Sequence, residues 1–262
     1  MVDDEKFLIS CDNGIATLTF NWPKEVNSLG KDFTRGCLAA LDEIDEMPDL
    51  RVLILTGSGS VFCGGGNLFE IMGPDPQPIE QDLALLQGYN KVVDRLYHFR
   101  VPVIAAVNGP AIGGGVGIAM ACDFAIASDT ARYDLFFGLL GLAASDVGVS
   151  WLLTQHLGPA RANYYTYTAA SIKADECERL GLFAKVVPKE NLMSHVRGAA
   201  ERIVLSYSPL SASATKIAMR NAVNTSLHGA LAYDPFMQTV AFQSPDHKTR
   251  IHAYQKKIRN GT

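Results

Sequence analysis

The sequence lacks an excess of basic residues, long apolar runs and paired cysteines, and each absence removes a class of protein. The formal net charge of −4 argues against a general nucleic-acid-binding protein, which normally carries a basic excess. No apolar run approaches the roughly 20 residues that a membrane-spanning helix needs. The five scattered cysteines lack the CxxC or Cys/His spacing of metal sites, so we expect reduced thiols and no metal.

The N-terminal residues are acidic and lead directly into a strand pattern, so we expect no signal or transit sequence. We therefore expect a cytoplasmic protein. With 48% apolar and 19% charged residues in a chain of 262, the composition predicts a large hydrophobic core and not a disordered chain.

Strand and helix patterns alternate along the first two hundred residues. Residues 7–10 and 15–20 are strand-like runs joined by Asp12-Asn13-Gly14, a hairpin turn because these residues tolerate positive φ. Continuous apolar runs at 51–56 and 101–107 are typical of buried parallel strands. Helical spacing precedes or follows them, at 33–47, 83–99 and 115–121, and 124–127 is a further short strand. This order predicts an α/β fold.

After Pro209 the strand patterns end and helical segments dominate, with 211–223 and 230–242 the clearest. We expect two parts: a core over residues 1–200 and a C-terminal helical region over 201–262. The proline-rich segment 73–78 cannot be helical and is expected to form a loop beside the site.

Two glycine-rich segments each follow one of the buried strands. They are Val61-Phe-Cys-Gly-Gly-Gly-Asn-Leu68 and Asn108-Gly-Pro-Ala-Ile-Gly-Gly-Gly-Val-Gly117. Glycine runs that enter a helix leave unpaired N–H groups at the carboxyl edge of the sheet, which suits an anion or oxyanion. A Walker-type Lys-Ser/Thr is absent and the GxGxxG spacing fails, so a nucleotide-binding loop is disfavoured. Glycines that serve only helix–strand packing remain the alternative.

These motifs resemble those of the enoyl-CoA hydratase/isomerase (crotonase) family over essentially the whole chain. Residues 21–29 resemble N-x-P-x-x-x-N-x-L, residues 62–68 resemble F-x-A-G-x-D-L, and residues 106–115 resemble A-x-N-G-x-x-x-G-G-G. The resemblance implies a β-β-α spiral core, a C-terminal helical trimerisation region, and homotrimers or hexamers. It also implies an acyl-CoA thioester, or an acyl-carrier-protein thioester, whose carbonyl oxygen accepts the N–H groups of Gly66 and Gly114.

Family hydratases use two glutamates, and neither is present. The matching positions are Gly117 and Phe137, and Phe136 adds to an apolar wall. Two-glutamate hydration is therefore disfavoured.

One carboxylate remains well placed. Asp146 lies in a segment that resembles D-x-G-G-[ST]-x-L-L of family isomerases, where one acid moves a proton between the α- and γ-carbons. The apolar wall would raise its pKa toward useful basicity. Asp146 would also suit the N-cap of a helix over 147–157. Asp146 also matches the nucleophile of 4-chlorobenzoyl-CoA dehalogenases. Those enzymes carry a histidine and a tryptophan where this chain has Asn90 and Phe137, so dehalogenation is disfavoured.

The remaining predicted binding residues surround these motifs. They are Cys63, Gly64, Gly65, Asn67, Leu68 and Gly113 in the glycine segments, and Lys24 and Lys257 for the nucleotide end of CoA. CoA enters as part of the substrate, and we expect no separate cofactor, no nucleic acid and no membrane partner.

The leading hypothesis is an enoyl-CoA isomerase with a single Asp proton shuttle. The alternatives are another reaction on the same thioester (hydratase, hydrolase, decarboxylase, lyase or dehalogenase) or a homologue that binds acyl-CoA without turnover.

Overall fold

The computed structural model describes residues 6–71 and 77–259. The chain divides into two compact units, with the boundary in the sequence between Arg202 and Ile203. Most of the loop predicted at 73–78 lies outside the described residues. The first unit contains both glycine segments, and the second contains only helices among its described residues.

A hairpin opens the first unit. Strands β1 (Phe7–Asp12) and β2 (Ile15–Phe20) pair antiparallel. Asn13 and Gly14 take φ values of 52° and 75° between them, which is the positive-φ turn that the sequence predicts.

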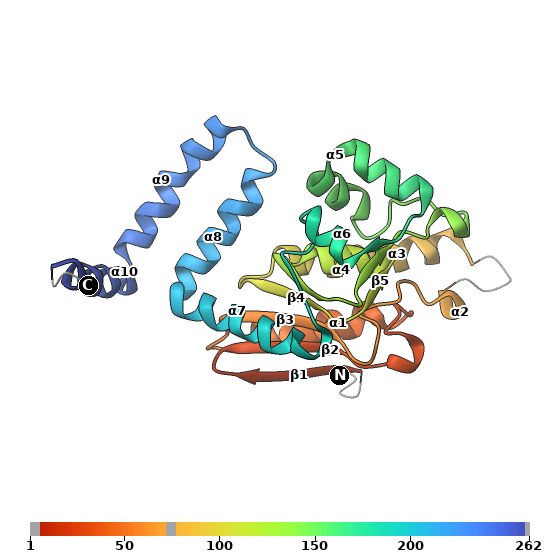
Figure 1. Cartoon of the computed structure of the whole chain (residues 1–262), viewed down its shortest axis with the longest axis horizontal. Helices are drawn as coiled ribbons and strands as arrows, with labels where there is room; N and C mark the ends of the chain where they lie inside the picture. The colour runs from red at the N-terminus through yellow and green to blue at the C-terminus, as the bar shows by residue number, and fades with distance from the viewer. Residues whose placement is uncertain (1–5, 72–76, 260–262) are drawn as a thin grey trace. The chain divides into compact units, whose positions relative to one another are not determined.

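The hairpin is one edge of a six-stranded sheet with the order β1-β2-β3-β4-β6-β9 (Figure 1). Beyond the hairpin all neighbours are parallel, through β3 (Val52–Gly57), β4 (Val103–Val107), β6 (Phe124–Ser128) and β9 (Lys185–Val187). Every residue of β3 is buried, which confirms the prediction from its continuous apolar run. Because β3 and β4 are parallel neighbours, the segments that follow them emerge side by side at one edge of the sheet.

Helices connect these strands: α1 (Phe33–Asp45), α2 (Leu68–Ile71), α3 (Ile79–Tyr97) and α4 (Gly114–Ala121). Aromatic rings hold α1 on the hairpin, with the centroids of Phe20 and Phe33 5.5 Å apart in an edge-to-face arrangement. Helix α3 packs against both α1 and α4. The α/β class predicted from the strand and helix order is confirmed.

A small second sheet, which the sequence analysis missed, has the order β5-β7-β8, with β5 (Pro110–Ile112), β7 (Arg132–Asp134) and β8 (Ile172–Lys173). The chain then forms α5 (Val149–Thr168), broken at Gly158 where φ is 71° and ψ is 163°, followed by α6 (Ala174–Arg179) and α7 (Leu192–Ser206). Three short 3-10 helices complete the described elements: η1 (Pro23–Glu25), η2 (Gly138–Leu140) and η3 (Lys189–Asn191).

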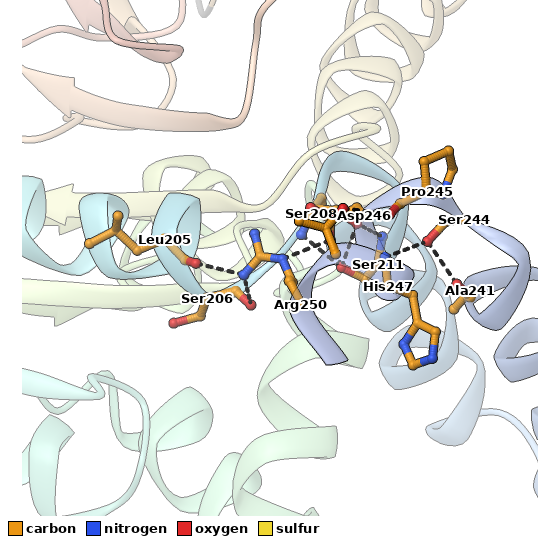
Figure 2. A network of polar contacts seen from close by, with 11 residues as sticks. Leu205, Ser206, Ser208, Ser211, Ala241, Ser244, Pro245, Asp246, His247 and Arg250 are labelled. Carbon is orange, nitrogen blue, oxygen red and sulfur yellow. Dashed lines mark hydrogen bonds and ion pairs between the residues drawn. The ribbon is translucent and has the colours of Figure 1, made fainter. Parts of the chain in front are cut away.

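The second unit contains α8 (Pro209–Ala222), α9 (Leu227–Gln243) and α10 (Pro245–Arg259). Figure 2 shows polar contacts at the end of α7, at the start of α8 and at the junction of α9 with α10. Ser208 and Ser211 form a reciprocal capping box at the start of α8. Arg250 donates to the carbonyls of Leu205 and Ser206, 2.8 and 3.2 Å away, and thereby satisfies acceptors that the end of a helix leaves unpaired.

Candidate functional site

The two glycine segments are joined by backbone hydrogen bonds. Cys63 and Ala111 form a parallel bridge, in which the Ile112 N–H donates to the Cys63 carbonyl at 2.9 Å and the Cys63 N–H donates to Pro110 at 3.4 Å. Gly115 sits against this bridge, because a Cβ there would lie 2.5 Å from the Cys63 carbonyl oxygen. The close approach requires glycine and fixes the two segments in one register.

A second parallel bridge orients Gly66. The Leu29 N–H donates to the Gly65 carbonyl at 2.7 Å, and the Asn67 N–H donates to the Leu29 carbonyl at 2.9 Å. Leu29 thus pairs with the residues on each side of Gly66, so the N–H of Gly66 itself points away from Leu29. Within residues 6–71 and 77–259, this N–H has no acceptor.

Gly114 supplies the other donor, as the first residue of α4. The first N–H groups of a helix have no partner inside it, and here the Gly114 N–H has no acceptor among the described residues. Gly113 before it has φ 51° and donates its N–H to the Asp134 carbonyl at 2.9 Å. The nitrogen of Gly114 lies 3.5 Å from the point where a Cβ on Gly65 would stand, so the two glycine segments converge here.

These glycines line a cavity of about 590 Å³. Its other walls come from α2, α3 and the segment 136–146, and they are mostly apolar. The Phe137 ring lies against the glycine segment, with its Cε1 atom 3.6 Å from the Cβ position of Gly113. A cavity of this size fits a small-molecule site, since such sites are concave, largely apolar and carry few polar groups.

Asp146 brings a carboxylate to this cavity, and its Oδ2 atom lies 3.6 Å from the point where a Cβ on Gly114 would stand. Burial raises the pKa of this carboxyl above its usual value, and a hydrogen bond from the Val147 backbone lowers it by less. A carboxyl group with a raised pKa in an apolar cleft is a candidate acid or base.

Tyr89 lies on the same wall but does not donate to Asp146. Its hydroxyl donates to the carbonyls of Leu29 and Gly30, at 2.9 and 3.0 Å. Burial, and secondarily the Asp146 charge, raise the pKa of this hydroxyl well above its usual value. Tyr89 therefore stays neutral and braces the residue that orients Gly66.

The helix-cap interpretation of Asp146 is wrong. Helix α5 begins at Val149 and not at Val147, its N-cap residue is Gly148, and no side chain caps it. The reason is local: Val147 and Gly148 both have positive φ, so the chain makes a turn before the helix starts. The Asp146 side chain is therefore available to the cavity.

The structure brings together most of the predicted site residues. Those that line the cavity are Gly64, Gly65, Gly66, Leu68, Asn90, Gly113, Gly114, Phe136, Phe137 and Asp146.

Five predicted residues lie elsewhere. The Cys63 thiol is buried behind the bridge, where burial raises its pKa to about 12, and Asn67 turns toward α2 by accepting the Phe69 N–H. Gly117 is covered by Val147, whose carbonyl oxygen would lie 2.4 Å from a Cβ at that position. Lys24 is exposed in η1 and Lys257 lies in α10 of the second unit, so their contact with a nucleotide stays a prediction.

Sequence reasoning missed about half of the lining. Leu86 lies four residues before Asn90 on α3, and Tyr89 lies three residues after Leu86, so helical spacing could have found both. The others come from loops, short helices and the three-residue strand β5, where no periodicity applies; they are Leu29, Ile71, Ile112, Leu139, Leu140, Leu142, Ala143 and Ser145.

No group of three His, Cys, Asp or Glu side chains in residues 6–71 and 77–259 could hold a metal ion. In the same ranges, no helix combines the length and apolar character needed to cross a membrane.

Comparisons with known proteins agree with this architecture. The family model described as "Enoyl-CoA hydratase/isomerase" matches residues 10–260. A short-chain-enoyl-CoA hydratase of Clostridium acetobutylicum is 34% identical, with 95% of this chain and 94% of that protein covered. A 1,2-epoxyphenylacetyl-CoA isomerase of Escherichia coli is 30% identical, with 96% of each covered. The crystal structure of an enoyl-CoA hydratase from Bacillus anthracis superposes with a TM-score of 0.91 at 28% identity, covering 96% of both chains.

The fold and the paired N–H groups thus define an acyl-CoA enzyme of the crotonase fold. The chain belongs to the enoyl-CoA hydratase/isomerase family.

The raised pKa of Asp146 predicts a pH-dependent stability effect. Between the unfolded and the folded pKa values the folded protein binds more protons, so this group's contribution to stability is lost as pH rises through that window. Above it the buried carboxylate is charged, whereas an amide carries no such desolvation cost. We expect Asp146→Asn to raise the thermal midpoint near pH 7 by about 2–4 °C, with the gain shrinking near pH 4.

Thermal unfolding of both proteins at each pH checks this, with the exposed Asp49→Asn as the matched control. A variant that is less stable than the parent near pH 7 would contradict the assigned cost of burial.

Proposed function

We propose that this enzyme isomerises an unsaturated acyl-CoA, moving the double bond from the 3- to the 2-position with Asp146 as the only proton carrier. The observation that supports it most directly is the Asp146 carboxylate beside Gly114, the one acid among the described residues that line this mostly apolar cavity. In this mechanism the thioester carbonyl oxygen accepts hydrogen bonds from the N–H groups of Gly66 and Gly114.

Asp146 removes a proton from the α-carbon, and the electron pair of that C–H bond moves into a dienolate. The two N–H donors stabilise the negative charge that collects on the thioester oxygen. Asp146 then gives the proton to the γ-carbon, and the double bond ends between the α- and β-carbons. Because one group both takes and returns the proton, no second acid is needed.

Hydration is the second candidate, because several relatives carry hydratase names, including that of Clostridium acetobutylicum. Hydration requires an activated water beside the β-carbon. The two positions that match the family's glutamates hold Gly117 and Phe137, and Phe137 is buried in the cavity wall. The apolar wall favours exclusion of water over its activation, so we place isomerisation first.

The acid is tested by Asp146→Asn, which keeps the shape but removes the basicity. We expect the turnover of a 3-enoyl-CoA to fall about 100-fold or more, because positioned general bases contribute that much. Deuterated water should label the γ-carbon of the product to the extent that the proton on Asp146 exchanges before transfer. Asp49→Asn should retain full rate.

If Asp146→Asn isomerises at the parental rate, Asp146 is not the base and another group must take that role. Measuring 2-enoyl-CoA in the same assays tests the alternative, since product hydrated at the β-carbon would indicate a hydratase.

The oxyanion donors are tested by a pair of variants at Gly114. Proline is tolerated at the first position of a helix but has no N–H, so Gly114→Pro should lower kcat about 100- to 1000-fold. Gly114→Ala keeps the N–H and adds a Cβ that would lie 2.9 Å from Leu29 Cδ1, the far end of a flexible side chain. It controls for the steric effect. Equal activity of the two variants would argue against Gly114 as a donor.

We further propose that the chain works as a homotrimer or hexamer through its helical second unit. Helix α9 has no buried residue within this chain, and large apolar side chains stay exposed on it, among them Leu231, Phe236 and Val240. Exposed apolar area of this kind is typical of an interface between protein chains.

Light scattering at micromolar concentration should give three or six times the chain mass. Phe236→Glu combined with Val240→Glu should lower it, because these positions are four residues apart on one helix face. A monomeric parent protein would contradict the proposal.

A further inference from the structure

The turn that follows Asp146 contains a buried valine in an unfavourable backbone conformation. Val147 has φ 43° and is 1% exposed, and Gly148 after it has φ 74°. The Val149 N–H donates to the Asp146 carbonyl at 2.9 Å, which closes a four-residue turn with positive φ at both central positions. This is the pattern of a type I′ turn, where asparagine, aspartate and glycine are normal and a β-branched residue is an outlier.

Contacts of the side chain explain why a valine is held there. Its Cγ2 atom lies 2.7 Å from the point where a Cβ on Gly117 would stand, and 3.4 Å from the same point on Gly114. The valine therefore occupies space that is open because α4 carries glycine at 117, and it lies at van der Waals distance from the Cβ position of Gly114. It touches the helix whose first N–H is the proposed oxyanion donor.

We propose that Val147 is the positioning residue for Asp146: packed against Gly117 and next to Gly114, it locks the turn that holds the carboxylate beside Gly114. The inference rests on the proposed role of Asp146 as proton carrier. Strained backbone of this kind persists only where surrounding contacts determine it, and it concentrates at functional sites. Here the strained residue, Val147, directly follows the proposed reacting residue, Asp146.

This packing also gives Gly117 a role that does not involve substrate. A Cβ at position 117 would lie 2.4 Å from the Val147 carbonyl oxygen, and backbone atoms cannot move aside as a side-chain end can. Any side chain at 117 would therefore displace the turn and, with it, Asp146. Val147 and Gly117 are thus a matched pair on two separate elements.

The test approaches the turn from both sides. Val147→Gly removes the packed side chain and relieves the positive-φ strain, Gly117→Ala pushes the turn from α4, and Val147→Thr keeps the β-branched shape. Gly198→Ala is the matched control, because a Cβ on Gly198 in α7 meets nothing within 4 Å. Each variant is assayed with a 3-enoyl-CoA for kcat and KM, beside its thermal midpoint, and Asp146→Asn is run in parallel.

We expect Val147→Gly and Gly117→Ala each to lower kcat about 10- to 100-fold, with KM within about 2-fold of the parent, because a displacement of about 1 Å costs that much in rate. Val147→Thr should recover most of the rate, and Gly198→Ala all of it. A purely structural valine would instead lower the thermal midpoint and leave kcat unchanged in the folded fraction.

The outcomes separate the two proposals. Loss of rate in Asp146→Asn together with parental kcat in Val147→Gly and Gly117→Ala would overturn the positioning role and leave the proton shuttle intact. A parental rate in Asp146→Asn would overturn the shuttle, and the positioning role with it. If Val147→Gly does not fold, the kcat values of Gly117→Ala and Val147→Thr decide whether Val147 positions Asp146.

Discussion

The site depends on the two parallel bridges that hold the first glycine segment between its neighbours. One bridge joins Cys63 to Ala111, and the other joins Leu29 to Gly66. A parallel bridge uses the N–H and carbonyl groups of only one of its two residues, so the second bridge leaves the Gly66 N–H pointing outward. Without these bonds the two donors would have no fixed separation, and preorganisation is what makes such donors effective. The two bridges therefore fix the positions that the proposed function assigns to the oxyanion donors.

The sequence predicted this part well because it depends on short-range rules. Continuous apolar runs identified β3 and β4, and glycines after both strands predicted donors at a shared edge, which the parallel pairing of the strands places side by side. The turn at Asp146 could not be predicted in the same way. A valine with positive φ contradicts local preference, and only its contact with two glycines of α4 makes it tenable. The same limit applies to the short sheet β5-β7-β8, whose strands of two or three residues carry no periodicity.

The surroundings of Asp146 explain how one carboxylate could serve as a base. Exposed in water it would be a weak base, but burial raises its pKa, and the mostly apolar lining of the cavity limits solvation. The same burial costs folding stability when the group is charged, which is a common exchange at active sites. Tyr89 does not offset this cost, because its hydroxyl donates to backbone carbonyls. Among the described residues no side chain donates a hydrogen bond to this carboxylate, which suits the role of a base in the proposed function.

An oxyanion hole alone does not select a reaction, since it stabilises the enolate of any thioester in the same way. The selection must come from the groups placed along the acyl chain. In this chain Phe137 lines that wall, and Val147 covers Gly117 from the other side. Neither Gly117 nor Phe137 offers an acid, and Val147 fills the space beside Gly117. In the proposed reaction, a proton that leaves the α-carbon has one carboxylate acceptor among the described residues that line the cavity, so the dienolate would recover that proton at the γ-carbon. The apolar wall and Asp146 therefore act together in the proposed reaction.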